Sequence, residues 1–202
     1  MDQALKDVFA EYDARIAREA EVFRAGGPVN IDDMLLAVGP VVGSLMHTLI
    51  VGHGAKRIVE LGTSYGYSVH WLADAARETG GKVITMDVAA DKQAYARKRI
   101  ERAGLSPFVE FRTGNAVDLL AAVDEPIDFV LLDIWKDLYV ACLETFFPKL
   151  APGALVVADN MLRPVDARPH AEAYQAAIRG KPGVQSMLLA MGSGIELSRK
   201  AA

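Results

Sequence analysis

From residue 57 onward, short apolar runs alternate with segments whose apolar residues recur at helical spacing. The runs that predict strands are 57–61, 82–87, 108–113, 127–133 and 154–159. The patterns that predict helices are 67–79, 91–103, 115–122, 136–148 and a segment near 169–179. Nearly continuous apolar strands that alternate with helices are typical of a parallel sheet with helices on both faces. The alternation therefore predicts an α/β fold.

The last two apolar runs break this alternation. Residues 184–190 and 195–199 are separated by a turn that contains Gly-Ser-Gly, which favours an antiparallel β-hairpin. Added to the five parallel strands, the hairpin completes a Rossmann-like, mainly parallel sheet of seven strands with an antiparallel C-terminal edge. Ligands of such sheets bind beyond the carboxyl ends of the strands. The polar residues at those ends are therefore the candidates for function.

The first 55 residues precede this core and are predicted to be helical. A helical stripe within 1–24 consists of Leu5, Val8, Phe9, Tyr12, Ile16 and Phe23. We expect this helix to pack on the core, and a lid over the site or a homodimer contact are open alternatives. Residues 25–30 form a turn, and Asp32 is a candidate cap for the next helix. The uncharged stretch 34–55 contains Gly, Pro and His, which favour a buried helix over a membrane span.

Composition limits the domain count, the partners and the compartment. A chain of 202 residues fits one domain, in which 1–55 would cover the site and 56–202 would form the Rossmann-like core. Lys and Arg number 22 against 26 Asp and Glu, a formal net charge of -4 that argues against phosphate-mediated nucleic-acid binding. The single cysteine, Cys142, excludes an intrachain disulfide and suits a cytoplasmic protein. We expect a small-molecule substrate, and neither nucleic acid nor a membrane as partner.

The ends of the first three predicted strands suit a nucleoside cofactor. The loop ELGTSYGYS (60–68) carries two glycines, which let the backbone approach a ligand closely. Asp87 ends the second strand, where an acid accepts hydrogen bonds from ribose hydroxyls. Asn115, beside Gly114, follows the third strand and can pair with a base edge. S-adenosylmethionine (SAM) fits this set, because its zwitterionic methionine end would meet the loop amides and the Ser68 hydroxyl.

The fourth and fifth strand ends predict a metal site. Asp133 ends one strand, and Asp159 and Asn160 end the next. All three offer oxygen, which Mg²⁺ prefers, and they leave positions for water or a chelating substrate. Lys136 lies at a predicted helix start, close enough to act as a base on a hydroxyl held by the metal. The alternative is that the aspartates cap helices and the lysine is a surface charge, but their joint placement favours a site.

Other candidate groups carry weaker signals. The loop lacks G-x-G-x-x-G, which weakens a nicotinamide-dependent oxidoreductase without removing it as an alternative. The hydroxyls of Ser64 and Ser68 have no evident His/Asp relay, which argues against a hydrolase. The histidines show no metal-ligand clustering, and we expect His47 and His53 to be structural and Cys142 to lie in the core.

Several of these segments together resemble the cation-dependent O-methyltransferases, most closely catechol O-methyltransferases. They are ELGTSYGYS (60–68), TMD (85–87), LDIWKDLY (132–139) and ADN (158–160). The similarity runs from about residue 30 to the fifth strand, and more weakly through the hairpin. It implies a class I methyltransferase fold, SAM as cofactor, and Mg²⁺ or another divalent cation. It also implies methyl transfer to a hydroxyl of a catechol-like vicinal diol.

The resemblance implies roles for individual positions. The implied cofactor-binding residues are Val38, Glu60, Gly62, Ser68, Asp87, Gly114, Asn115, Ala116, Val117 and Asp133. The implied metal ligands are Asp133, Asp159 and Asn160, and the implied general base is Lys136. The implied substrate-binding residues are Trp135, Lys136, Asn160 and Pro164. Trp135 and Pro164 would wall an aromatic ring.

The substrate half departs from the family pattern. Ile134 stands where catechol enzymes have histidine, and the segment after Asn160 offers no clear counterpart to a substrate-holding glutamate. A catalytically silent cofactor-binding module therefore remains an alternative, beside the nicotinamide-dependent oxidoreductase.

Overall fold

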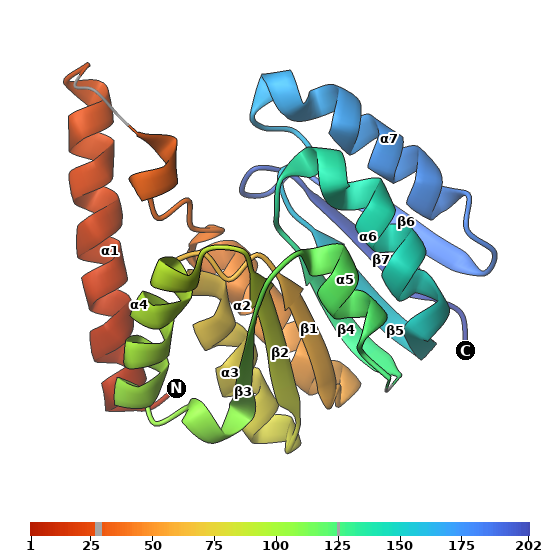
Figure 1. The fold of residues 1–202 in the computed structure, drawn as a ribbon, viewed down its shortest axis with the longest axis horizontal. Coiled ribbons are helices and arrows are strands. Elements are labelled where there is room, and N and C mark those ends of the chain that lie inside the picture. Colours follow the sequence, from red (N-terminus) through yellow and green to blue (C-terminus); the bar gives the residue numbers. More distant parts are fainter. Residues whose placement is uncertain (27–29, 125) are drawn as a thin grey trace.

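The structure is a computed structural model that describes residues 1–26, 30–124 and 126–202. A seven-stranded sheet with the order β3-β2-β1-β4-β5-β7-β6 forms its centre (Figure 1). The strands are β1 (Arg57–Leu61), β2 (Lys82–Asp87), β3 (Val109–Thr113), β4 (Ile127–Leu132), β5 (Leu150–Ala158), β6 (Val184–Leu189) and β7 (Ile195–Lys200). β1 to β5 pair in parallel, and β7 runs antiparallel to both β5 and β6. The predicted parallel sheet with a terminal hairpin is confirmed.

Helices cover both faces of the sheet (Figure 1). One face carries α1 (Gln3–Arg24), α2 (Gly39–His53), α3 (Tyr67–Thr79) and α4 (Ala90–Arg102). The other face carries α5 (Ala116–Ala121), α6 (Tyr139–Phe146) and α7 (Arg168–Arg179). Successive strand residues point to opposite faces, so Ile58 joins the first core and Val59 the second.

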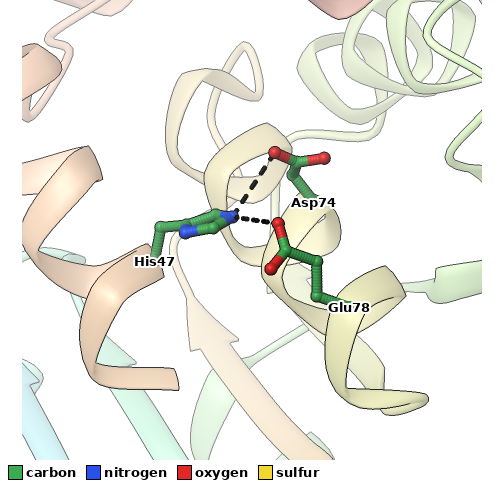
Figure 2. A group of neighbouring side chains, drawn as sticks. All are labelled: His47, Asp74 and Glu78. Carbon is green, nitrogen blue, oxygen red and sulfur yellow. Dashed lines mark ion pairs between the residues drawn. The ribbon is translucent and has the colours of Figure 1, made fainter. Parts of the chain in front are cut away.

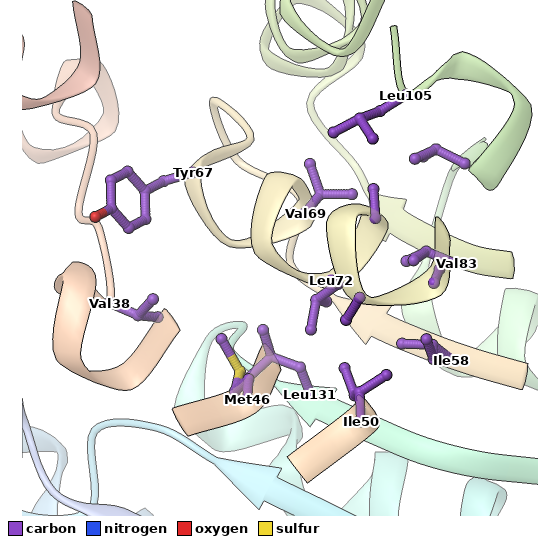
Figure 3. Close-up of a cluster of buried hydrophobic side chains, with 14 of the residues drawn as sticks. Val38, Met46, Ile50, Ile58, Tyr67, Val69, Leu72, Val83, Leu105 and Leu131 are labelled. Carbon is purple, nitrogen blue, oxygen red and sulfur yellow. The ribbon is translucent and has the colours of Figure 1, made fainter. Parts of the chain in front are cut away.

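The core on the α2–α3 face shows why these segments pack as they do. Ile58 and Val83 of the sheet lie beneath Leu72 of α3, and Ile50 of α2 lies close by (Figure 3). All four side chains are fully buried, which stabilises the fold by about 1.5–3 kcal/mol for each large aliphatic side chain. Apolar packing thus fixes α3, and with it the loop that precedes α3, against β1.

Several element boundaries differ from the predictions, most of them by one residue. The predicted helix 136–148 is divided into a 3₁₀ turn at Lys136–Leu138, helix α6, and a second 3₁₀ turn at Phe147–Lys149. Pro148 lacks a backbone N–H and cannot continue α6. Phe108 lies in a 3₁₀ turn rather than in β3, and β5 begins at Leu150 because Leu150 pairs with Ile127 across a register shift.

The N-terminal predictions are partly wrong. Leu5, Val8, Phe9 and Tyr12 are buried and Ile16 is partly buried, but Phe23 is 69% exposed because the end of α1 extends beyond the core (Figure 1).

Asp32 does not cap the next helix. It lies inside the 3₁₀ turn Ile31–Asp33, which Asn30 caps, and α2 begins later, after Val38. Residues 27–29 of the predicted turn lie outside the described residues. The uncharged stretch 34–55 contains helix α2, whose Val42, Met46 and Ile50 are buried. Among the described residues, no helix combines the length and apolarity needed to cross a membrane.

Candidate active site

Gly62 joins the two halves of the site at the point where the strand order reverses between β1 and β4. The Asp133 amide donates a hydrogen bond to the Leu61 carbonyl at 2.9 Å. A Cβ atom on Gly62 would lie 1.9 Å from the Asp133 carbonyl oxygen, and the φ angle of Gly62 is +102°. Both facts require glycine here. Gly62 and Asp133, predicted from separate motifs, are therefore direct neighbours.

Glu60 anchors a buried polar network beneath the loop. Its carboxylate is fully buried and accepts hydrogen bonds from Ser68 Oγ and Thr85 Oγ1, each at 2.5 Å. Burial raises the pKa of Glu60 to about 8, although these two hydrogen bonds oppose the shift. Such a carboxylate is suited to meet a positively charged amino group, because a cation would restore its ionised form.

Asp87 holds the first two strand ends together. Its Oδ2 accepts from the Ser64 amide at 2.7 Å, and its Oδ1 accepts from the Ala89 amide at 2.8 Å. A carboxylate has roughly four lone-pair sites, so both oxygens keep capacity for a ribose hydroxyl. Asp87 therefore shapes the loop as well as offering acceptors to a ligand.

The third strand end leads into a capped helix. Gly114 has a φ angle of +152°, and the Asn115 side-chain oxygen accepts from the Val117 amide at 2.9 Å. This oxygen caps α5 instead of facing a base edge, a role that the sequence interpretation missed. Ala116 is buried against the sheet, and Val38 lies across the structure near Tyr67 in the first core (Figure 3).

Three hydrogen bonds hold the Lys136 side chain close to the end of β4. Its Nζ donates to Asp133 Oδ1 at 3.2 Å, to the Ile134 carbonyl at 2.7 Å and to the Tyr139 hydroxyl at 2.8 Å. The three contacts use the three hydrogens of an ammonium. Lys136 is therefore not a free surface charge, and the segment that positions it is a 3₁₀ turn rather than the predicted α-helix start.

Asp159 and Asn160 complete the metal candidate. Asp159 is 4% exposed, and burial together with repulsion from Asp133 raises its pKa to about 7. The Asn160 amide donates to Asp159 Oδ1 at 2.7 Å, and Asn160 has a φ angle of +62°, where asparagine is among the tolerated residues. Two carboxylates that repel each other, followed in the chain by an asparagine that offers an amide oxygen, are a donor set that would fit a hard divalent cation.

Two apolar side chains remain accessible near these strand ends. Trp135 is 61% exposed, and Pro164 is exposed after the fifth strand. Each therefore has free surface for contact with a planar ligand.

Two neighbouring residues escaped the sequence interpretation. Tyr139 is fully buried, and its hydroxyl donates to the carbonyls of Leu132 and Asp159, which links both strand ends to Lys136. Its position three residues after Lys136 in the LDIWKDLY motif was the available signal. Thr85 bridges Glu60 and Thr63, and its place inside the TMD motif was the corresponding signal.

The sequence interpretation did not predict which residues surround the His47 side chain. This side chain lies between α2 and α3 beside Asp74 and Glu78, an arrangement that could hold a metal ion (Figure 2). Cys142 is buried, as predicted.

A sheet of this order, with a glycine loop after β1 and an acid after β2, defines a class I SAM-dependent methyltransferase. Comparisons with known proteins agree. A family model described as O-methyltransferase matches residues 20–201. The chain belongs to this O-methyltransferase family, and the resemblance to its cation-dependent, SAM-using members is confirmed.

Individual relatives refine this placement. Catechol O-methyltransferase of Niastella koreensis is 34% identical over 81% of this chain and 73% of its own length. Caffeoyl-CoA O-methyltransferase 5 of Nicotiana tabacum is 29% identical over 78% of this chain and 74% of its own length. The O-methyltransferase TomG of Streptomyces achromogenes, solved in complex with SAM, has a TM-score of 0.80 and 27% identity, covering 100% of this chain and 91% of its own.

Proposed function

We propose that this O-methyltransferase transfers the methyl group of SAM to one hydroxyl of a catechol-like vicinal diol, with Mg²⁺ or another divalent cation held by Asp133, Asp159 and Asn160. The observation that carries the proposal is the contact between Lys136 and Asp133 beside the buried carboxylate of Asp159. The Niastella koreensis relative named catechol O-methyltransferase supports the substrate class.

The cofactor-binding roles follow from the strand ends. Glu60 and Ser68 would receive the methionine end, and Asp87 would accept hydrogen bonds from the ribose. The loop 114–117 would lie on the adenine side, and Val38 would contact the cofactor from the start of α2. Gly62 would let the backbone approach the methionine portion, because no side chain fits between it and Asp133.

The proposed roles in binding the methyl acceptor follow from the oxygen atoms of the proposed metal ligands. A divalent cation held here supplies chelation of both diol oxygens and makes the reacting hydroxyl more acidic. Asp133, Asp159 and Asn160 would orient the diol, and Trp135 and Pro164 would flank its ring. Because SAM and the diol would be held side by side, proximity would supply much of the rate.

Lys136 would remove the proton of the reacting hydroxyl. To accept a proton, its Nζ must first lose one of the three hydrogens that now contact Asp133, Ile134 and Tyr139. A cation on Asp133 would weaken the first of these contacts, because the carboxylate charge would be shared. The fixed position that Tyr139 and Ile134 give to Nζ would then direct its lone pair to the acceptor.

The decisive experiment is turnover with a panel of acceptors in SAM and Mg²⁺. We expect methylation of catechols and no methylation of a matched phenol with a single hydroxyl, since only a diol can chelate. Caffeoyl-CoA belongs in the panel because relatives carry that name. SAM binding without turnover of any acceptor would favour the silent module, and tighter binding of NAD than of SAM would favour the oxidoreductase.

A further inference from the structure

Three side chains with metal-binding atoms meet between α2 and α3. His47 Nε2 lies 3.4 Å from Asp74 Oδ2 and 3.4 Å from Glu78 Oε1 (Figure 2). Asp74 and Glu78 are four residues apart on α3, so they project from the same face of that helix. The three ligand atoms all lie within 4.8 Å of one another.

Two of these atoms are buried and lack hydrogen-bond partners. Asp74 is 1% exposed, and neither its Oδ2 nor His47 Nε2 has a hydrogen-bond partner among the described residues. The two atoms lie 3.4 Å apart, within the range of an ion pair, but neither completes a hydrogen bond. A buried polar atom without a partner costs about 1–3 kcal/mol. A shared cation would satisfy both atoms at once.

The spacing suits a tetrahedral ion of the zinc type. Zinc binds histidine nitrogen and carboxylate oxygen at ~2.0–2.2 Å, which places two tetrahedral ligands ~3.4 Å apart. Octahedral Mg²⁺ at ~2.1 Å would place neighbouring ligands ~3.0 Å apart and prefers oxygen alone. The imidazole nitrogen therefore favours zinc over magnesium, and the two 3.4 Å separations are compatible with a tetrahedral ion.

The surrounding charges orient the ligands. Arg77 donates to Asp74 Oδ1, which leaves Oδ2 directed at His47. Arg77 is in turn paired with Asp2 at 2.6 Å. The Met1 amino group lies 3.7 Å from Asp74 Oδ2, and this group would have to move when a cation binds. Hydrogen bonds from residues that do not themselves touch the metal, such as the one from Arg77 to Asp74, typically strengthen a metal site.

We propose that His47, Asp74 and Glu78 form a structural zinc-type site that fixes α2 against α3. Glu78 has a side chain that is 47% exposed, so water can complete the tetrahedron from the solvent side. Asp74 lies six residues beyond Ser68 on α3, about 9 Å along the helix axis from the proposed cofactor position, and the site shares no residue with the proposed Mg²⁺ site.

The test uses the full chain without an affinity tag, stripped of metal and then supplied with excess Mg²⁺ to fill the proposed catalytic site. Zinc is titrated in competition with a chromophoric chelator. We expect one tight equivalent in the parent protein. Glu78→Gln and His47→Gln should each weaken zinc binding roughly tenfold or more. His53→Gln is the matched control, because His53 is an exposed histidine on the same helix.

Thermal unfolding gives a second readout that is independent of methyl transfer. Zinc should raise the Tm of the parent and of His53→Gln, because an ion that binds the folded state stabilises that state. The increase should be much smaller for Glu78→Gln, which lacks one of the proposed zinc ligands. Glu78→Gln is expected to fold, because it replaces one partly exposed carboxylate with an amide of the same shape, and circular dichroism verifies this. Absence of zinc binding in excess Mg²⁺, or equal binding by the parent and Glu78→Gln, would overturn the proposal.

Discussion

Lys136 Nζ lies 3.2 Å from Asp133 Oδ1, so the proposed base and a proposed metal ligand form a direct ion pair. The Lys136 side chain is only 14% exposed, and Tyr139 and the Ile134 carbonyl hold its other hydrogens. A cation and a protonated lysine would compete for the same carboxylate. Occupation of the metal site would therefore release one Lys136 contact for the reacting hydroxyl.

Lys136→Met should lower kcat by ~10²-fold or more, the range expected when a general base is lost. The affinity for SAM should change little, because Lys136 is proposed to act on the acceptor hydroxyl. Lys136→Arg should not restore the rate, since arginine stays protonated. Single-turnover methyl transfer at saturating Mg²⁺ measures the effect. Near-normal turnover by Lys136→Met at neutral pH would assign proton removal to another group.

Mg²⁺ binding should weaken as the pH falls below about 7. The pKa of Asp159 is raised to about 7 by burial and by the charge of Asp133, so protons compete with the cation below that pH. The affinity should fall by up to about tenfold per pH unit below 7 and level off above it. Calorimetric Mg²⁺ titrations between pH 5.5 and 8.5 test this. A flat profile in the parent, or an unchanged affinity in Asp159→Asn, would contradict it.

Asp87→Ala should weaken SAM binding by roughly ten- to a hundredfold, because it removes charged acceptors worth about 1.5–3 kcal/mol. The structure adds that Asp87 also holds the amides of Ser64 and Ala89. Asp87→Asn keeps one acceptor oxygen and should weaken binding less than Asp87→Ala. Calorimetry on both variants, with circular dichroism as the folding control, gives the answer. Unchanged affinity in Asp87→Ala would refute the ribose assignment.

Glu60 should make the cofactor-free protein less stable as the pH rises. Burial raises the pKa of Glu60 to about 8, above the value of 4.5 that the unfolded chain would show. The folded state therefore holds more protons between these values, and its stability falls as the pH climbs from about 5 to 8. Glu60→Gln should make this slope shallower and leave the part that comes from Asp159, whose pKa is also raised. Urea unfolding across that range measures the slope, with Glu101→Gln as an exposed control; a slope as steep in Glu60→Gln as in the parent would count against the assignment.

Gly62→Ala should destabilise the fold and abolish SAM binding. The added Cβ would overlap the Asp133 carbonyl, and the φ angle of +102° is strained for alanine. Overpacking and backbone strain together cost roughly 2 kcal/mol or more. Gly52→Ala is the matched control, because a Cβ there meets open space and Gly52 lies within α2. Thermal unfolding distinguishes them, and equal stability of the two variants would contradict the close approach.

The strands were predictable because their signal is local. The run 57–61 is apolar enough to be buried on both faces, and β1 has the predicted bounds. The early start of β5 was not predictable, since Leu150 becomes a strand residue only by pairing with Ile127. The predicted burial of Phe23 was wrong for a similar reason, because helical spacing cannot show that α1 extends beyond the core.

Some residues of the candidate site were also predictable from the sequence, and others were not. Asp133, Lys136 and Asp159 were identified because each follows a strand, and the fold gathers strand ends at one edge. The capping role of Asn115 and the grouping of His47 with α3 depend on side-chain direction and on how two helices pack. Sequence spacing does not contain that information.

The reversal of strand order between β1 and β4 limits how the chain can be recombined with a relative. Among the described residues, β1–β3 and β4–β7 pair within the sheet along one seam, where Ile58 to Leu61 lie beside Phe129 to Leu132. Both hydrophobic cores cross this seam, because Leu131 packs in one core with Ile58 and Val130 packs in the other with Val59. A chimera that joins residues 1–126 of this chain to the second half of a relative should therefore fold only when the side chains along the seam match in volume.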